Sequence, residues 1–339
     1  MSSSTPLSVA VIGTGRIGVR HAENLARFVP GARLAAVADV NLPAATALAE
    51  RLGTPRVSAD YRDLLADPSI AAVVICTPTD THARLIEESA AAGKHIFCEK
   101  PIDFDLARTD RALAAAAQAG VTLQIGFNRR FDPHVRRLAA AVTAGEIGAP
   151  HLLRITSRDP APASLDYLRG SGGIFLDMAI HDFDLARHLL GEVVEVHATG
   201  AVLVDPAIGA LGDVDTAVTV LRFANGALGT IDNSRRAVYG YDQRVEVFGS
   251  GGQAATRNVE LDSVVISNGS GQHAAKPLYF FLERYGEALV AELQAFVAAV
   301  QAGTPAPVGG ADGRAAVVIG LAAKRSLAEG RPVRVAEIG

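Results

Sequence analysis

The feature that most constrains this chain is the glycine motif GTGRIG at residues 13–18. It directly follows a short β-branched run at 8–12, and it opens a stretch at 17–28 whose pattern predicts a helix. A second apolar strand at 32–38 then ends in Asp39. Strand, glycine turn, helix, strand and acid in this order are typical of a βαβ unit that binds a dinucleotide.

Each residue of the motif has a physical role in this interpretation. Gly13 makes the tight turn, Gly15 lets the backbone approach a pyrophosphate, and Gly18 lets the helix pack closely on the strand. At the N-terminus of the predicted helix, the N–H groups of Arg16 and Ile17 are expected to face the anion. A glycine-rich turn with a purely structural role is the alternative, and the neighbouring strand, helix and acid disfavour it.

Asp39 distinguishes between the two nicotinamide cofactors. Its carboxylate can accept hydrogen bonds from the adenosine ribose hydroxyls, and it would repel a 2′-phosphate. The following residues are Val40 and Asn41, so no arginine is at hand to pair with such a phosphate. We therefore expect NAD as the cofactor.

Strands and helices continue to alternate after this unit. Strands are predicted at 71–76, 95–98 and 122–127, with helices between them. The run 71–76 (AAVVIC) is apolar throughout, as in strands buried within a parallel sheet. We expect residues 1–127 to form a doubly wound α/β Rossmann domain that binds its ligand outside the carboxyl ends of its strands.

Residues that follow two of these strand ends join the predicted cofactor site: Thr77, Pro78, Glu99 and Lys100. Lys100 is held between Glu99 and Pro101, at the crevice where the nicotinamide should bind. Its ammonium group can donate to a substrate hydroxyl and stabilise a developing alkoxide. A solvated surface lysine is the alternative.

A second domain for substrate binding and oligomerisation is predicted at 128–339, built mostly on an open antiparallel sheet, with a last helix that is expected to pack back on the first domain. Its strand-like runs are VVEVHATG, AVLV, TAVTVLRF, ALGTIDNSRR and QRVEVFG. Asn225–Gly226 predicts a hairpin between two of them, and the glycine-rich 248–253 predicts a second turn. One face of such a sheet stays free, so we expect it to contact a second subunit. A helix at 283–302 and a final helix capped by Asp312 follow.

The stretch 172–190, GGIFLDMAIHDFDLARHLL, combines a helical apolar rhythm with an acid–base pair. Asp177 and His181 stand four residues apart, so a single helix would present both on one face. A histidine steadied by a carboxylate is a good general base near neutral pH. A salt-bridged aspartate beside a surface histidine is the plainer alternative. A metal site that adds Asp184 is disfavoured, because no second histidine lies on this face.

Composition limits the partners and the location. The net charge is −4 with no basic block, which disfavours nucleic acid and anionic membranes. The N-terminal MSSSTPLS lacks the features of a signal peptide, and no apolar run is long enough to span a bilayer. Cys76 and Cys98 have no metal-like spacing, so we expect reduced, buried thiols in a cytoplasmic protein.

Three segments together resemble the family of glucose–fructose oxidoreductase and inositol dehydrogenase (Gfo/Idh/MocA). They are the glycine motif at 13–18, AGKHIFCEKP at 92–101 and GGIFLDMAIHDFD at 172–184. The resemblance covers essentially the whole chain, and 167–190 is most similar to the inositol 2-dehydrogenases within the family. It implies NAD-dependent oxidation of a ring hydroxyl of myo-inositol to the 2-keto inosose, in a homo-oligomer, a tetramer or a dimer.

The resemblance also assigns roles to individual residues. It implies that Lys100 binds the substrate, that His181 is the general base and that Asp177 is its companion. It further implies that Arg130 and Tyr241 contribute to the substrate pocket. No metal is implied.

Two other functions are kept as alternatives. One is oxidation of another cyclic polyol or sugar, such as scyllo-inositol or an aldose, because pocket loops decide the substrate and the fold does not. The loop at 158–165 (RDPAPASL) is expected to cover the pocket mouth. The other is a non-catalytic sensor of sugars or dinucleotides, which the presence of Lys100, Asp177 and His181 together disfavours.

Overall fold

The computed structural model describes residues 5–54 and 56–339. Part of the N-terminal MSSSTPLS, in which no signal peptide is expected, lies outside the described residues. The chain divides into two compact units, of which the first comprises the segment ending at Phe131 together with Glu287–Val317. The second unit comprises Asp132–Gly286 and Val318–Gly339.

This division differs from the expected domains 1–127 and 128–339. The first boundary lies close to the expected one, but Glu287–Val317 returns to the first unit. The returning segment carries most of helix α12 (Gly286–Ala302) and the beginning of helix α13 (Gly310–Glu329). The last helix was expected to pack back on the first domain, and the part of α13 up to Val317 does belong to the first unit. The return of α12 was not expected, because sequence patterns report only local conformation.

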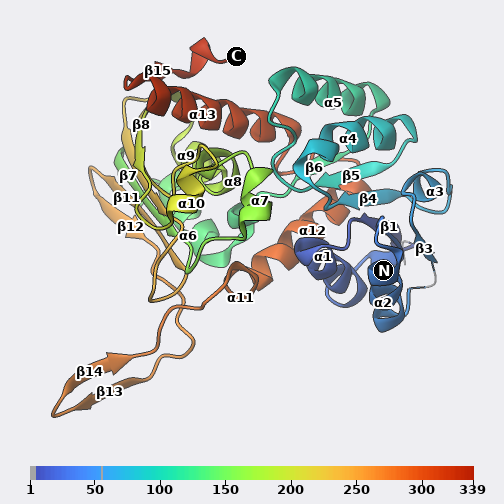
Figure 1. The fold of residues 1–339 in the computed structure, drawn as a ribbon, viewed down its shortest axis with the longest axis horizontal. Coiled ribbons are helices and arrows are strands. Elements are labelled where there is room, and N and C mark those ends of the chain that lie inside the picture. Colours follow the sequence, from blue (N-terminus) through green and yellow to red (C-terminus); the bar gives the residue numbers. More distant parts are fainter. Residues whose placement is uncertain (1–4, 55) are drawn as a thin grey trace. The chain divides into compact units, whose positions relative to one another are not determined.

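The first unit contains a parallel six-stranded sheet, in the order β3-β2-β1-β4-β5-β6 (Figure 1). Its strands are β1 Leu7–Ile12, β2 Ala32–Ala38, β3 Arg56–Ser58, β4 Ala72–Ile75, β5 His95–Cys98 and β6 Leu123–Ile125. The strand order reverses between β1 and β4, and ligands of such sheets bind at that point. The predicted doubly wound α/β domain is confirmed, while the short edge strand β3 was not predicted.

Helix α1 begins and ends within one residue of the predicted 17–28, and helices lie between the later strands as predicted. They are α1 Arg16–Arg27, α2 Leu42–Leu52, α3 Arg62–Leu65, α4 His82–Ala91 and α5 Leu106–Ala119, with short 3₁₀ turns at Thr79–Thr81 and Asn128–Phe131. Apolar side chains of α1, α2 and α12 form one core with residues of the sheet. In that core Leu293 and Phe296 of α12 are fully buried, which explains why the late segment belongs to this unit.

The second unit contains a seven-stranded sheet, in the order β12-β11-β7-β10-β9-β8-β15. Its strands are β7 Pro150–Arg158, β8 Val193–Ala201, β9 Thr216–Phe223, β10 Leu228–Ser234, β11 Asp242–Gly249, β12 Gly252–Ala255 and β15 Val333–Arg334. The predicted hairpins are confirmed: β9 pairs with β10 and β11 pairs with β12, both antiparallel. The sheet is not wholly antiparallel, because β7 and β10 pair in parallel.

One face of this sheet is buried and the other is exposed. Along β9, buried and exposed residues alternate strictly from Ala217 to Phe223. The buried face packs on α6 (Pro133–Thr143), α9 (Ile180–Leu190) and the later part of α13. The expected strand at 201–204 does not continue past Ala201. Instead the carboxylate of Asp215 accepts the N–H groups of Leu203, Val204 and Asp205, which turns the backbone away from the sheet.

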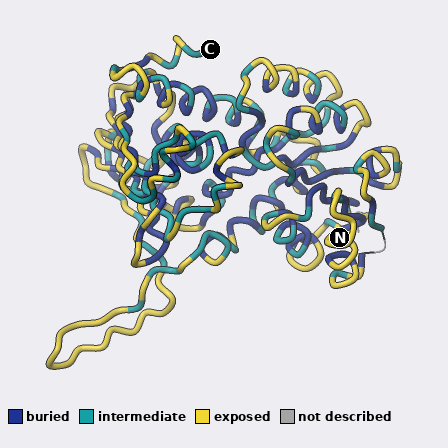
Figure 2. The backbone as a smooth tube through the Cα atoms, in the orientation of Figure 1, coloured by how far each residue is buried: buried dark blue, intermediate teal, exposed yellow. Residues whose placement is uncertain are grey.

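The remaining elements of the second unit are short. They are α7 Leu165–Arg169, α8 Ile174–Asp177, α10 Pro206–Gly209, α11 Phe281–Arg284, the 3₁₀ turn Val335–Glu337, and a hairpin of β13 Val265–Asn268 and β14 Gly271–Ala274. This hairpin extends away from the unit's other strands and is exposed along its length (Figures 1 and 2). The expected helix 283–302 is interrupted at Tyr285, whose backbone is not helical.

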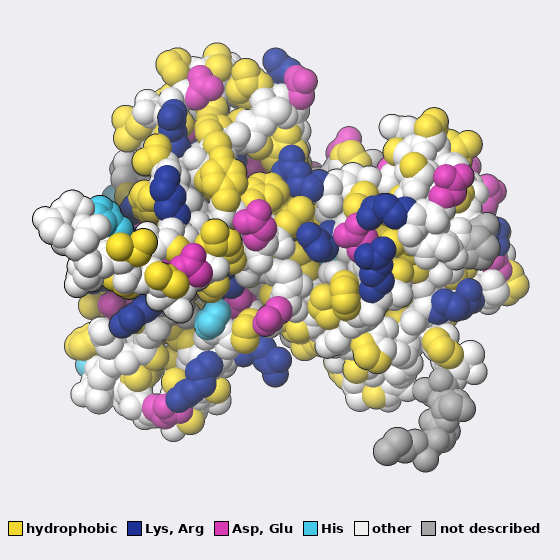
Figure 3. All heavy atoms as spheres, turned by 90° about the horizontal axis from the view of Figure 1, so that it is seen from below, with side chains coloured by type: hydrophobic (Ala, Val, Ile, Leu, Met, Phe, Trp, Pro, Cys, Tyr) yellow, Lys and Arg dark blue, Asp and Glu magenta, His cyan; other side chains and the backbone are white. Residues whose placement is uncertain are grey.

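Other expectations concern the thiols and the surface. Cys76 and Cys98 are buried free thiols, as predicted, and burial raises the pKa of both. Within the described ranges, every helix is too short or too polar to cross a membrane. On the face shown in Figure 3, basic and acidic side chains are interspersed, with no block of one sign.

Candidate functional site

The glycine motif forms the turn between β1 and α1. A Cβ atom at Gly13 would lie 2.7 Å from the carbonyl oxygen of Cys76, and one at Gly18 would lie 1.9 Å from the carbonyl oxygen of Gly13. At Gly15, the N-cap of α1, a Cβ atom would meet no atom within 4 Å. Two of the glycines are therefore required by packing within the unit, while the third borders open space at a helix N-terminus, where an anion fits.

Asp39 lies at the carboxyl end of β2, half-exposed, and it is joined to the glycine turn. Its Oδ2 accepts the Thr14 N–H at 2.6 Å and the Thr14 hydroxyl at 2.9 Å, and its Oδ1 accepts the Asn41 N–H at 2.8 Å. Burial alone would raise the pKa of Asp39, but these hydrogen bonds outweigh it and lower the pKa. A charged carboxylate thus stands beside the turn, as recognition of a ribose diol requires. Arg16 is exposed and Ile17 half-buried at the start of α1.

The turns after β4 and β5 carry the other predicted cofactor residues. Thr77 is half-buried, with its hydroxyl hydrogen-bonded to that of Thr81 at 2.6 Å, and Pro78 is exposed. Lys100 is half-buried, and the peptide bond between Lys100 and Pro101 is cis. The Glu99 carboxylate points inward, where its Oε1 accepts a hydrogen bond from His21 Nε2 at 2.7 Å. Its contact with a cofactor stays a prediction.

The expected single helix over 172–190 is interrupted. Helix α8 ends at Asp177, α9 begins at Ile180, and the Ala179 N–H returns to Ile174, one residue beyond the normal helical partner. The apolar rhythm of the stretch is nevertheless correct, since Ile174, Phe175 and Phe183 are buried in the unit's core. Asp177 and His181 therefore lie at the facing ends of two helices, so the prediction that one helix presents both on a single face was wrong.

Asp177 is held by two residues that the sequence did not indicate. Its Oδ1 accepts the hydroxyl of Tyr167 at 2.7 Å, and its Oδ2 accepts the guanidinium Nη1 of Arg235 at 3.0 Å. Arg235 is only 1% exposed. Its Nη2 also lies 3.6 Å from Asp213, whose carboxylate accepts the N–H of Ile174. A buried arginine therefore links Asp177 to the entry of α8.

Two residues assigned to the substrate pocket have other contacts. The guanidinium of Arg130, 9% exposed, donates to Asp312 Oδ1 at 3.0 Å within the first unit. Asp312 lies in the first turn of α13 rather than at its N-cap, and it also accepts the Gly309 N–H. Tyr241 is buried in the second unit with its ring edge-on to Tyr285. For both residues, contact with a substrate stays a prediction.

The loop that begins at Arg158 is anchored to the sheet of the second unit. Arg158 Nε donates to Asp232 Oδ1 at 2.6 Å, and its Nη1 donates to the hydroxyl of Tyr239 at 3.2 Å. That hydroxyl in turn donates to Asp242 at 2.6 Å. Arg158 therefore supports the sheet at its end, and the expected cover of a pocket would fall to the residues that follow it.

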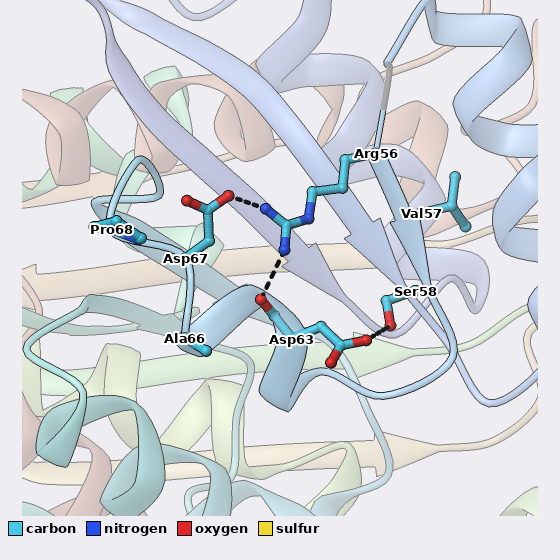
Figure 4. A pocket seen from close by; sticks show the side chains of 7 residues that line it. All are labelled: Arg56, Val57, Ser58, Asp63, Ala66, Asp67 and Pro68. Carbon is cyan, nitrogen blue, oxygen red and sulfur yellow. Dashed lines mark hydrogen bonds and ion pairs between the residues drawn. The ribbon is translucent and has the colours of Figure 1, made fainter.

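A separate pocket lies at the sheet edge of the first unit, between β3 and α3 (Figure 4). It contains none of the predicted site residues. Arg56 in its wall is already paired with Asp67 and hydrogen-bonded to the carbonyl of Asp63. These internal pairs satisfy the pocket's charges, so we assign it no ligand.

Family comparisons agree with both units. The model described as "Oxidoreductase family, NAD-binding Rossmann fold" matches residues 7–127, and the model of the GFO/IDH/MocA C-terminal domain matches residues 135–255. Together they span most of the chain.

Similar proteins cover nearly its whole length. The chain is 52% identical to a myo-inositol 2-dehydrogenase of Thermotoga maritima, over 98% of this chain and 99% of that protein. It is 48% identical to an inositol 2-dehydrogenase of Rhizobium meliloti, over 96% and 98%. A crystal structure of scyllo-inositol dehydrogenase from Lactobacillus casei with bound NAD(H) and scyllo-inositol has a TM-score of 0.92 at 30% identity, over 98% and 99%.

The charge of Asp39 should decide cofactor choice. We expect NADH to bind more tightly than NADPH by about tenfold or more, because hydrogen bonds to a charged group contribute about 1.5–3 kcal/mol. Asp39→Asn keeps an acceptor for Thr14 but removes the charge. It should therefore bind NADH more weakly and NADPH more tightly, so that the two affinities become more similar. Dissociation constants from cofactor fluorescence test this. Equal affinities in the wild type would contradict it.

The buried pair of Arg235 and Asp177 should be sensitive to loss of one partner. Arg235→Met leaves carboxylates without their counter-charge, and breaking such a buried pair costs about 3–5 kcal/mol. Arg236→Met, at the exposed neighbouring position, is the matched control and should change stability little. Urea unfolding of both variants measures the difference, and equal midpoints would show that the ion pair does not stabilise the unit.

Proposed function

The chain belongs to the Gfo/Idh/MocA oxidoreductase family, and on that premise we propose that it oxidises a ring hydroxyl of myo-inositol to the 2-keto inosose with NAD. The observation that carries the proposal is 52% identity, over nearly the full length of both chains, to a protein named myo-inositol 2-dehydrogenase. The presence of Lys100, Asp177 and His181 in the same chain supports a catalytic function rather than a sensor.

The residues of the first unit fit an NAD molecule. Open space borders Gly15 at the N-terminus of α1, and the half-exposed Asp39 carboxylate stands at the end of β2. The helix N-terminus suits the pyrophosphate and the carboxylate suits the ribose hydroxyls. When bound, the nicotinamide supplies the acceptor for a hydride.

The chain's own residues then handle the hydroxyl proton. In the proposed mechanism an imidazole nitrogen of His181 takes that proton as the general base, which requires the neutral ring. Lys100 donates from its ammonium group to the reacting oxygen, where it stabilises developing negative charge. Asp177, held by Tyr167 and Arg235, either orients and stabilises the imidazolium or binds a neighbouring hydroxyl.

A second candidate substrate is scyllo-inositol, an isomer of myo-inositol. The similar Lactobacillus casei enzyme, solved with scyllo-inositol, favours this alternative. Initial rates with NAD across myo-inositol, scyllo-inositol and glucose test the proposal. Higher kcat/KM for myo-inositol is expected, a preference for scyllo-inositol would select the second candidate, and no turnover of any polyol would overturn both.

We propose that the enzyme is a cytoplasmic homo-oligomer, a tetramer or a dimer. The two buried free thiols support a reducing compartment. The exposed face of the second unit's sheet supports assembly, because large apolar side chains project from neighbouring strands: Leu152, Val194, Val218, Val220, Leu228 and Phe248. Apolar patches of this kind mark contact surfaces.

Removal of His181 should lower the rate and spare cofactor binding. General-base catalysis is typically worth about 10²–10⁴-fold, so His181→Ala should reduce kcat by that factor while the NAD dissociation constant stays near the wild-type value. Wild-type activity should rise with pH as the imidazole loses its proton. His188→Ala, at an exposed position on the same helix, is the control. If the His181→Ala enzyme kept most of its kcat, His181 would not be the general base.

The sheet face gives an assembly prediction. Val218 and Val220 are exposed on β9, and charges there would have to be buried without partners on association. The double variant Val218→Glu, Val220→Glu should therefore reduce the mass found by light scattering. Val238→Glu, at an exposed position outside the sheet, should leave the mass unchanged. A wild-type monomer at micromolar concentration would refute the proposal.

A further inference from the structure

Both chain neighbours of Lys100 are anchored by buried histidines that come from different helices. His21 of α1 hydrogen-bonds through Nε2 to Glu99 Oε1 at 2.7 Å. His82 of α4 hydrogen-bonds through Nδ1 to the carbonyl oxygen of Pro101 at 2.8 Å. All of these residues belong to the first unit, so the arrangement is complete within it.

His21 is fully buried, and its ring lies edge-on to Phe97 with centroids 5.2 Å apart. Its Nδ1 has no hydrogen-bond partner among the described residues. The ring therefore carries its proton on Nε2 and donates it to the Glu99 carboxylate, because a bare ring nitrogen is less costly to bury than an unpaired N–H. The Glu99 carboxylate also packs on Gly126, where a Cβ atom would lie 3.1 Å from Oε2.

His82 joins two turns at the carboxyl ends of neighbouring strands. Its Nδ1 faces the Pro101 carbonyl and its Nε2 faces the Thr77 carbonyl, both at 2.8 Å. The ring is 1% exposed, and burial lowers the pKa of His82; the two carbonyls and the charge of Glu99 oppose that shift, while Lys100 adds to it. A neutral ring has one N–H and donates to only one of the two carbonyls, whereas a protonated ring donates to both. The His82 side chain therefore contacts both turns, and its hydrogen bond holds at least one of them.

A metal ion is a competing explanation for part of this cluster. One ligand atom from each of His21, Glu99 and Glu292 lies within 4.8 Å of the others. However, the 2.7 Å between His21 and Glu99 is hydrogen-bond length, whereas two ligands at zinc distances stand roughly 3.4 Å apart in a tetrahedron. Burial and the charge of Glu99 raise the pKa of Glu292 well above its ordinary value, which disfavours the charged form that would bind a metal ion. We therefore interpret the contact between His21 and Glu99 as a hydrogen bond that supports the turn.

We propose that His21 and His82 are positioning residues for the reaction, which fix the chain on either side of Lys100 so that its ammonium group meets the reacting hydroxyl. This rests on the proposed function, in which Lys100 donates to that oxygen. A displacement of about 1 Å in a catalytic group can cost about 100-fold in rate. Removal of His21 or His82 should therefore lower the rate by displacing the ammonium group of Lys100.

The test is a double-mutant cycle with Lys100→Met. His21→Leu and His82→Leu should each lower kcat by about 10- to 100-fold. NAD should still bind, because the glycine turn and Asp39 are untouched, although Glu99 and Thr77 of the predicted cofactor site each lose a contact. In the Lys100→Met background, the same changes should cost less than about twofold, because residues that act as a unit are not additive. If the histidine variants still lowered kcat by about 10- to 100-fold in the Lys100→Met background, the proposal would be wrong.

Two further variants separate positioning from general stability. His95→Leu removes a histidine at the opposite end of β5, where Nδ1 accepts the Thr122 N–H at 3.1 Å, and it should leave kcat within about twofold of wild type. The conservative change His21→Gln keeps a donor for Glu99 and should restore much of the lost rate. Equal loss of rate in His95→Leu, or no rescue by glutamine, would identify a merely structural effect.

Hydrogen exchange gives a readout that does not depend on turnover. Exchange of the peptide spanning 97–104 should accelerate in His21→Leu and His82→Leu but not in His95→Leu. If the wild type oxidised no polyol, the proposed function would be wrong. The exchange rates would still show whether His21 and His82 hold the segment around Lys100 in place. Unchanged exchange in both variants would overturn it even in an active enzyme.

Discussion

The close approach of α1 to the ends of β1 and β4 is the constraint on which the first unit depends. A side chain at Gly18 would overlap the carbonyl oxygen of Gly13, so the helix can lie there only because that position lacks one. His21 follows one turn later on the same face of the helix. The packing that brings the helix N-terminus to the dinucleotide edge therefore also brings His21 to Glu99, and so supports the turn of Lys100.

The parts of the fold that could be predicted from the sequence are those that local sequence signals determine. Glycines, apolar runs and helix caps reveal backbone conformation within a few residues, and the Rossmann strands, their helices and the Asn225–Gly226 hairpin follow from such signals. Pairings between distant segments have no such signal. The parallel pairing of β7 with β10 and the return of Glu287–Val317 to the first unit are set by tertiary packing, which overrides pattern.

The candidate site divides in the same way. Lys100, Asp177 and His181 could be singled out because motifs and spacing draw attention to them. The residues that hold them in place could not be singled out in this way. Arg235 lies 58 residues from Asp177, and His21 lies 78 residues from Glu99. An arginine at the end of a predicted strand and a histidine within a predicted helix look like ordinary surface residues in the sequence. Only burial distinguishes them, and burial is a property of the assembled unit.

His21, His82 and His181 differ in what their surroundings permit. A general base must reach the proton that it accepts and then release it. His21 is sealed in the interior with its proton donated to Glu99, and His82 is sealed with both ring nitrogens against backbone carbonyls. Neither can take a proton from a substrate without breaking the contacts that hold the Lys100 turn. His181 is half-buried at the start of α9, and this partial exposure suits the role of general base that we propose for it.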